Sequence, residues 1–145
     1  ISHKSSIVEE LFDKAYNFHN NSGTNELFGQ NLLILGTEYT PDFYHILVSK
    51  ILGLGVETYS ARWQIVERNG WRFPFRTFDD IVLRQLHLSK VEGILLQAAG
   101  RSRVEQTDSA VFIINKFPHP QGEVLGGKFE DLPQQIKTIL NQRIS

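Results

Sequence analysis

Two arginines at the end of a predicted helix are the residues of this chain best suited to chemistry. They lie in residues 97–103, which read Gln-Ala-Ala-Gly-Arg-Ser-Arg and come a few residues before a predicted buried strand. Gly100 frees the backbone, so Arg101 and Arg103 can project from the helix end toward an anion in a cleft. Planar, permanently charged guanidinium groups stabilise charge on a transferring phosphoryl group, as an arginine finger does. The spacing alone leaves equally open that both arginines are solvated residues of a connector.

Aromatic and basic residues interleave across residues 62–78. Asn69 and Gly70 separate two alternating runs, which is a strong signal for a β-hairpin, and Pro74 confines its strand to a sheet edge. Such interleaving is typical of surfaces on which the bases of a single strand stack. The alternation favours the alternative, in which the aromatic residues pack a small core and the arginines are solvated. The residues concerned are Trp63, Trp71, Phe73 and Phe75, among Arg62, Arg68, Arg72 and Arg76.

The loop over residues 36–41 follows a predicted strand and precedes a predicted helix. Loops at the carboxyl end of a parallel strand are where α/β proteins bind anions. The favoured interpretation is nevertheless an ordinary β-α turn in which a threonine caps the helix.

The elements that would position these residues follow from hydrophobic periodicity. A parallel sheet needs continuous apolar strands, and residues 32–35 and 110–114 supply two. The longest predicted helix, residues 79–100, has a predicted cap at Thr77. Further helices are predicted over residues 5–18, 40–53 and 132–144. The pattern predicts one α/β domain, residues 1–145, with a mainly parallel sheet and an inserted hairpin at residues 62–78.

Composition excludes several classes of protein. The chain has 145 residues, a formal net charge of -1 and no cysteine, so it has no overall basic field and no disulfide or thiolate metal site. Its five histidines show no metal-ligand spacing, and we expect no metal site. No apolar run reaches the roughly 20 residues of a membrane span. We expect an intracellular, cytoplasmic protein with no membrane partner. Because residues 1–4 lack Met, we also expect a piece of a longer protein.

The pattern Gln-x-x-Gly-Arg-x-Arg before a buried strand resembles motif VI of superfamily 2 helicases, whose usual form is Gln-x-x-Gly-Arg-x-x-Arg. The second arginine comes one residue early in this chain. The resemblance implies catalytic roles for Gln97, Arg101 and Arg103, with Gly100 at the nucleotide.

Two further segments resemble other helicase motifs in the family's order. Residues 22–25, Ser-Gly-Thr-Asn, followed by the strand at residues 31–35, are similar to motif V, and residues 1–4 resemble motif IV. The resemblance implies that Gly23 permits close approach of the backbone, that Thr24 bonds a phosphate, and that Asn25 lies near the ribose or γ-phosphate.

Together these motifs identify the chain as similar to the C-terminal RecA-like lobe of a superfamily 2 helicase, a three-layer α/β fold. The phosphate-binding Gly-x-x-x-x-Gly-Lys-[Ser/Thr] sequence is absent. The resemblance therefore implies a separate N-terminal lobe that holds ATP and Mg²⁺, without which this chain is inactive. It also implies contacts with nucleic acid, DNA rather than RNA, through Thr37, Tyr39 and the hairpin residues Arg62, Trp63, Arg68, Trp71, Arg72 and Arg76.

Two other functions remain open. The chain could be a RecA-like module that binds nucleic acid or protein without catalysis. It could also be a separate α/β enzyme that holds a nucleotide at Gly36 and Thr37, but no glycine-rich fingerprint accompanies that loop.

Overall fold

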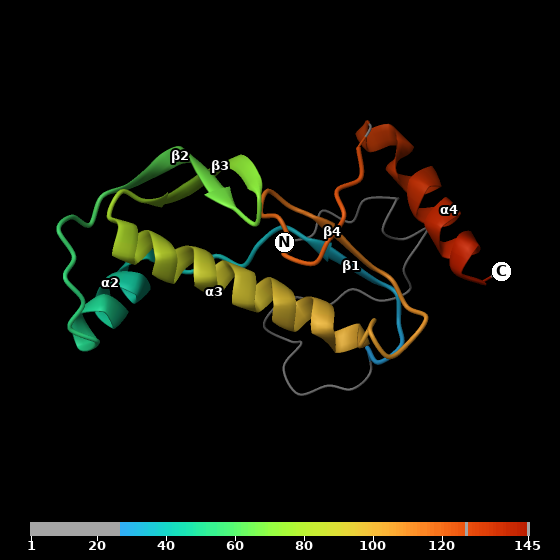
Figure 1. The fold of residues 1–145 in the computed structure, drawn as a ribbon, viewed down its shortest axis with the longest axis horizontal. Coiled ribbons are helices and arrows are strands. Elements are labelled where there is room, and N and C mark those ends of the chain that lie inside the picture. The colour runs from blue at the N-terminus through green and yellow to red at the C-terminus, as the bar shows by residue number, and fades with distance from the viewer. Residues whose placement is uncertain (1–26, 127, 145) are drawn as a thin grey trace. The chain divides into compact units, whose positions relative to one another are not determined.

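The computed structural model describes residues 27–126 and 128–144 (Figure 1). These residues divide into two compact units. Unit 1 contains residues 27–35, 97–114 and the described residues from 121 onward, and unit 2 contains residues 36–96 and 115–120. The predicted helix over residues 5–18 lies outside the described residues. The expectation of a single domain stays a prediction.

Unit 1 is built around a pair of parallel strands, β1 (Leu32–Leu35) and β4 (Val111–Ile114). The start of the pair is fixed from both sides. The Asn31 side chain accepts a hydrogen bond from the Ala110 N–H at 2.8 Å, and the Leu32 N–H donates to the Ala110 carbonyl at 2.9 Å. Both predicted strands and their parallel pairing are confirmed.

The burial of β1 differs from the expectation of a strand covered on both faces. Only Ile34 is buried, and Leu35 is 40% exposed. Among the described elements, α4 is the one whose apolar residues join Leu33, Ala110 and Phe112 in a cluster, so the strand pair is covered only in part.

Helix α4 (Leu132–Ile144) supplies much of the core of unit 1 and confirms the predicted last helix. Ile136, which is fully buried, packs with Ala110 and Phe112 at the start of β4. Leu33 and three apolar residues of α4 surround this cluster, namely Leu132, Ile139 and Leu140. The helix thus covers the strand pair through one apolar stripe.

Unit 2 contains the predicted hairpin, formed by β2 (Ala61–Arg68) and β3 (Trp71–Phe78). Asn69 and Gly70 have φ of 55° and 77°, the left-handed conformations that a two-residue type I′ turn requires. Pro74 lies on β3 opposite Ile65 of β2. The prediction of a hairpin with an Asn-Gly turn is confirmed.

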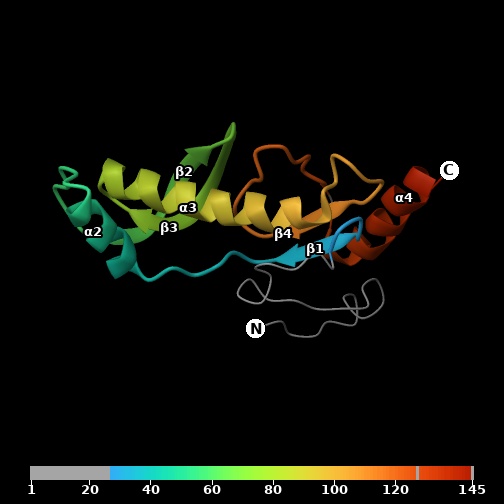
Figure 2. The same ribbon diagram turned by 90° about the horizontal axis from the view of Figure 1, so that it is seen from below.

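Helix α3 (Ile81–Ala99) is the longest described element and lies against the hairpin, as both Figure 1 and Figure 2 show. Its Leu83, Leu88, Val91 and Leu95 are buried, as are Val66 and Phe73 of the hairpin. Arg68 ties β2 to α3, because its guanidinium bonds the Glu92 carboxylate at 3.1 and 3.2 Å and the Gln85 side chain at 3.0 Å. The predicted long helix is confirmed.

The cap of α3 is Asp80, so the prediction of a Thr77 cap is wrong. Asp80 Oδ1 accepts hydrogen bonds from the N–H groups of Val82 and Leu83 at 2.8 and 3.2 Å. Its other oxygen accepts from the Glu57 N–H at 2.9 Å. These bonds lower the pKa of the Asp80 carboxyl. Thr77 instead lies inside β3, fully buried, with its hydroxyl turned to another partner.

Helix α2 (Asp42–Ile51) confirms the predicted helix after the Gly36 loop, but polar residues and not the large apolar ones are buried. The buried residues are polar, His45 and Ser49. Large apolar residues on the same helix are exposed, Phe43 by 68% and Ile51 by 74%. Periodicity predicted the helix correctly and did not predict which side packs.

The described residues thus form a mixed α/β structure with a small parallel sheet and a separate antiparallel hairpin. None of the helices in this part of the chain combines the length and the apolar composition that crossing a bilayer requires.

Replacing Asp80 tests the cap. We expect Asp80→Ala to lower the thermal stability of unit 2, because two α3 N–H groups and the Glu57 N–H lose their acceptor. Asp80→Ser should retain part of the stability, since serine also caps helices. Thermal unfolding followed by circular dichroism measures both. The control is Asp108→Ala, at an exposed carboxylate of unit 1, and equal shifts for the two alanine variants would contradict the assignment.

Candidate functional site

The segment over residues 97–103 turns sharply after α3. Gly100–Ser102 form a short 3-10 helix, and Arg103 follows in the left-handed conformation with φ of 50°. The Arg103 N–H donates to the Gly100 carbonyl at 3.1 Å. Gly100 itself does not have positive φ, and a side chain there would meet nothing within 4 Å. The left-handed residue of this turn is therefore Arg103 and not Gly100.

The two arginines of this segment have different surroundings. Arg101 is half-buried, and within the described part of the chain it has no hydrogen bond or ion pair. Arg103 is exposed, with its guanidinium carbon 5.4 Å from the centre of the Phe28 ring, which is cation–π distance. Gln97 is exposed in the last turn of α3. Among the described residues, neither cation of the predicted site is held by a carboxylate.

Residues 27–31 are fastened to this segment. The Gly29 N–H donates to the carbonyl of the buried Ser102 at 2.9 Å. Thr107 adds hydrogen bonds from its hydroxyl to the Ser102 and Arg103 carbonyls at 3.3 and 3.1 Å. The residues that precede β1 thus meet the residues that carry Arg101. Gly23, Thr24 and Asn25 lie outside the described residues.

The loop after β1 differs from the favoured interpretation. Pro41 occupies the position before α2, and no side chain caps the helix there, so the predicted threonine cap is wrong. Gly36 has φ of 73°, a left-handed turn that glycine adopts without strain. Thr37 is half-buried and Tyr39 is 77% exposed. Tyr39 is the more accessible of the two predicted nucleic-acid contacts.

Three of the four hairpin arginines are held in ion pairs. Arg62 bonds Asp79 at 2.7 Å, and Arg68 bonds Glu92 as described above. Arg76 makes two parallel bonds to Asp42 of α2, at 2.8 and 2.9 Å, and these bonds lower the pKa of the Asp42 carboxyl. Arg72 is exposed and makes no such pair among the described residues. A phosphate contact by Arg62, Arg68 or Arg76 would have to replace a carboxylate partner.

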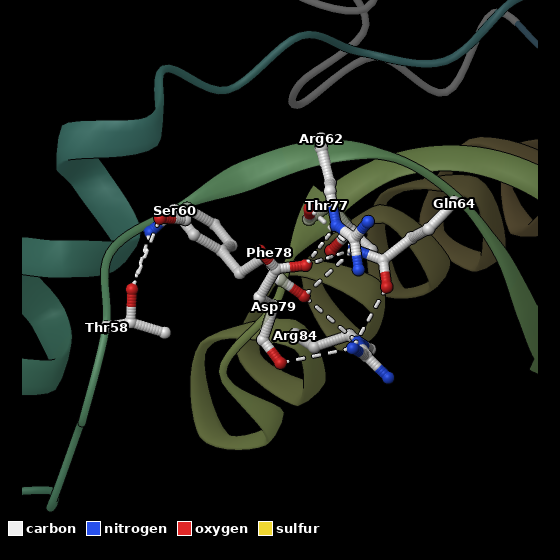
Figure 3. A network of polar contacts seen from close by, with 8 residues as sticks. All are labelled: Thr58, Ser60, Arg62, Gln64, Thr77, Phe78, Asp79 and Arg84. Carbon is white, nitrogen blue, oxygen red and sulfur yellow. Dashed lines mark hydrogen bonds and ion pairs between the residues drawn. The ribbon is translucent and has the colours of Figure 1, made fainter.

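A polar network closes the base of the hairpin (Figure 3). Arg84 of α3 donates to the carbonyls of Phe78 and Asp79 at 3.0 and 3.1 Å and to the Gln64 side chain at 3.0 Å. Gln64 in turn donates to the Thr77 carbonyl at 3.0 Å. Arg84 and Gln64 therefore hold α3 to the hairpin and are not part of an exposed site.

The aromatic residues of the hairpin divide between core and surface. Phe73 and Phe75 stack edge to face with Phe117, at 5.5 and 5.6 Å between ring centres, so they form a small core. Trp63 is 60% exposed, with Lys116 Nζ 4.7 Å from its ring centre. Trp71 is 48% exposed beside the turn. The phenylalanines therefore form the small core that the favoured alternative predicted, and the two tryptophans are exposed. Binding of nucleic acid by the tryptophans stays a prediction.

Two imidazoles, the buried His45 and the half-buried His87, lie between α2, α3 and the hairpin. The ring centres of His45 and His87 are 4.9 Å apart, and His87 Nδ1 lies 2.9 Å from the Thr77 hydroxyl. Burial lowers the pKa of both, that of His87 to about 4. His45 is also near Lys90 and Asp42, and His87 is near Asp42 and Arg76. No local sequence pattern predicts this pair, because the two histidines are 42 positions apart and only the fold brings them together.

Within the described ranges, no group of three or more histidine, aspartate or glutamate side chains is placed to hold a metal ion. No protein-family model, curated protein or solved structure matches this chain. The site is therefore argued from its own residues.

Lowering the pH tests the two imidazoles. We expect unit 2 to lose stability as the pH falls from 6.5 toward 4, because an unfolded histidine binds a proton near 6.5 and folded His87 only near 4. Protonation then favours the unfolded state. Urea unfolding followed by tryptophan fluorescence reports on unit 2, which contains both tryptophans. His87→Gln should flatten this part of the pH dependence, and an unchanged profile would contradict the assignment.

Proposed function

We propose that this chain is the second, C-terminal RecA-like lobe of an ATP-dependent helicase or translocase of superfamily 2. The supporting observation is the segment at the end of α3, where Arg101 has no partner among the described residues and Arg103 stacks on Phe28. The Gly29–Ser102 hydrogen bond brings this segment to the residues that follow the motif V-like sequence. The resemblance expects that proximity between motifs V and VI.

The proposed fold is a three-layer RecA-like domain with a mainly parallel sheet. The parallel β1–β4 pair and the order helix, Gly-Arg-x-Arg, strand support it. In this proposal the hairpin over residues 62–78 is an insertion between the two strands of that pair.

In this proposal Arg101 is the arginine finger. ATP and Mg²⁺ are held by the separate N-terminal lobe, and closure of the two lobes brings Arg101 to the γ-phosphate. Arg101 suits this role, because no ion pair within the described residues has to break before its guanidinium can bind the transferring phosphoryl group. Arg103 and Gln97 assist catalysis, Gly100 lies at the nucleotide, and Gly23, Thr24 and Asn25 approach it from the motif V-like loop.

Arg101→Ala in the complete two-lobe protein tests this role. We expect the rate of ATP hydrolysis to fall by about 10³-fold or more, as for loss of an arginine finger. ATP binding should change little, because the other lobe holds the phosphates. Turnover assays and equilibrium nucleotide binding separate the two effects. The control is Lys50→Ala, which removes an exposed cation of α2 in unit 2, and equal losses in both variants would contradict the assignment.

The hairpin surface supports nucleic-acid binding in the lobe, and equally in a module without catalysis, the second candidate function. The residues that remain available are Trp63, Trp71, Arg72 and Lys116, since the other hairpin arginines are paired. Two exposed indoles beside two cations suit a single strand, because stacking needs an aromatic face and the backbone needs positive charge.

Titration with single-stranded DNA tests this surface. Because Trp63 and Trp71 are the only tryptophans, we expect the intrinsic fluorescence to be quenched on binding, and the affinity to fall as salt rises. Trp63→Ala should weaken binding by about 1–3 kcal/mol, the usual contribution of one stacked base. Phe43→Ala removes an exposed aromatic residue of α2 and should leave the affinity unchanged. Salt-independent binding, or none at low salt, would contradict the proposal.

A further inference from the structure

The two edges of the hairpin differ in how well they are protected. Proteins usually guard exposed strand edges with proline, charge or a covering element, because unpaired backbone groups invite another strand. The β3 edge contains Pro74 between Arg72 and Arg76. The corresponding residues of β2 include Trp63 and Ile65, which are 60% and 59% exposed. The β2 edge therefore has no proline, whereas the β3 edge is protected by Pro74.

The register shows which backbone groups face that edge. A two-residue turn is flanked by a pair that exchanges both hydrogen bonds, here Arg68 and Trp71. Hydrogen-bonded pairs then recur at every second position along the hairpin, so Ile65 and Pro74 form a non-hydrogen-bonded pair. This agrees with the chemistry of Pro74, which has no N–H to donate. The N–H and C=O groups that point away from β3 therefore belong to Ala61, Trp63, Ile65 and Glu67. No other described strand bonds them.

These four residues are self-complementary in an antiparallel arrangement. A two-fold axis at Gln64 places Trp63 opposite Ile65 of a second strand and Ala61 opposite Glu67. All four outward-facing residues then find a partner, which no neighbouring two-fold register achieves. Aromatic and β-branched residues are favourable cross-strand neighbours, and no like charges lie directly opposite. The register also places Gln64 next to its own copy as a non-bonded pair.

We propose that β2 pairs antiparallel with β2 of a second copy of this chain, with the two-fold axis at Gln64. The product is a four-stranded antiparallel sheet made from two hairpins, with the guarded β3 strands at its outer edges. Its exposed face carries Trp63 and Ile65 of both copies. The contact is small, so the dimer is weak and depends on concentration. The inference does not depend on the proposed helicase function.

Proline substitutions at the two edges provide a matched test in the full chain. Ile65→Pro and Arg72→Pro each remove an N–H that the β2–β3 ladder does not use, the first from the β2 edge and the second from the β3 edge. We expect a dimer by sedimentation equilibrium, a dimer Kd raised at least about tenfold by Ile65→Pro, and no change with Arg72→Pro. Circular dichroism confirms that both variants stay folded. A wild-type chain that remains monomeric at all concentrations overturns the proposal.

A cysteine placed on the axis keeps the test decisive if Ile65→Pro does not fold. The chain has no cysteine, so Gln64→Cys is a single-thiol variant. Residues in a non-bonded antiparallel pair have Cα atoms about 4.5 Å apart, within the range that a disulfide spans. We expect mild oxidation to link Gln64→Cys chains into dimers much faster than Pro74→Cys chains. Equal rates for the two variants overturn the register.

The exposed apolar side of α2 is the rival contact. Leu47→Ser removes one of its exposed residues and leaves the hairpin unchanged. If Leu47→Ser abolishes the dimer and Ile65→Pro does not, the contact is made by α2, and the β2 proposal is wrong.

Discussion

The parallel pairing of β1 with β4 is the constraint on which the rest of the described structure depends. Parallel neighbours cannot be joined by a tight turn, because the chain must return to the same end of the sheet. Residues 36–110 make that return, and α2, the hairpin and α3 all lie within it. Where the return ends, the bonds of Asn31 to Ala110 and of Gly29 to Ser102 fix the segment with Arg101 at the start of the strand pair.

Unit 2 uses most of its charge to hold itself together. Arg68 joins β2 to α3, Arg76 joins β3 to α2, and Asp80 joins the start of α3 to the preceding loop. Arg68 and Glu92 are each about four-fifths buried, so removing one partner would leave the other charge poorly solvated. Ion pairs therefore engage three of the four hairpin arginines, Arg62, Arg68 and Arg76, and a phosphate would have to compete with their carboxylates. Of the cations in the two candidate sites, Arg101 and Arg103 belong to unit 1, and Arg72 and Lys116 belong to unit 2.

Local pattern predicted the elements well, because apolar periodicity and turn residues act over a few positions. The Asn69-Gly70 hairpin, α3, α4 and the parallel strands are all present where the sequence placed them. What failed depends on contacts between distant residues. Thr77 was expected to cap α3, but its side chain faces His87, a residue of the helix itself, and the nearer Asp80 takes the cap. The partners of the hairpin arginines and the burial of polar residues on α2 are likewise set by packing that no single segment reveals.

The backbone at Arg103 bears on the candidate site. A residue with a side chain in the left-handed conformation costs about 1–2 kcal/mol, and glycine would avoid that cost. Hydrogen bonds at the turn offset part of it, since the Arg103 carbonyl accepts from the Gln106 N–H at 2.8 Å and from the Thr107 hydroxyl at 3.1 Å. The same bonds would form with glycine, so they do not explain why arginine occupies the position. What arginine adds is the guanidinium over the Phe28 ring, a cation two residues after Arg101, which has no ion pair among the described residues. That is the arrangement expected if the side chain at position 103, and not only the turn, serves the site.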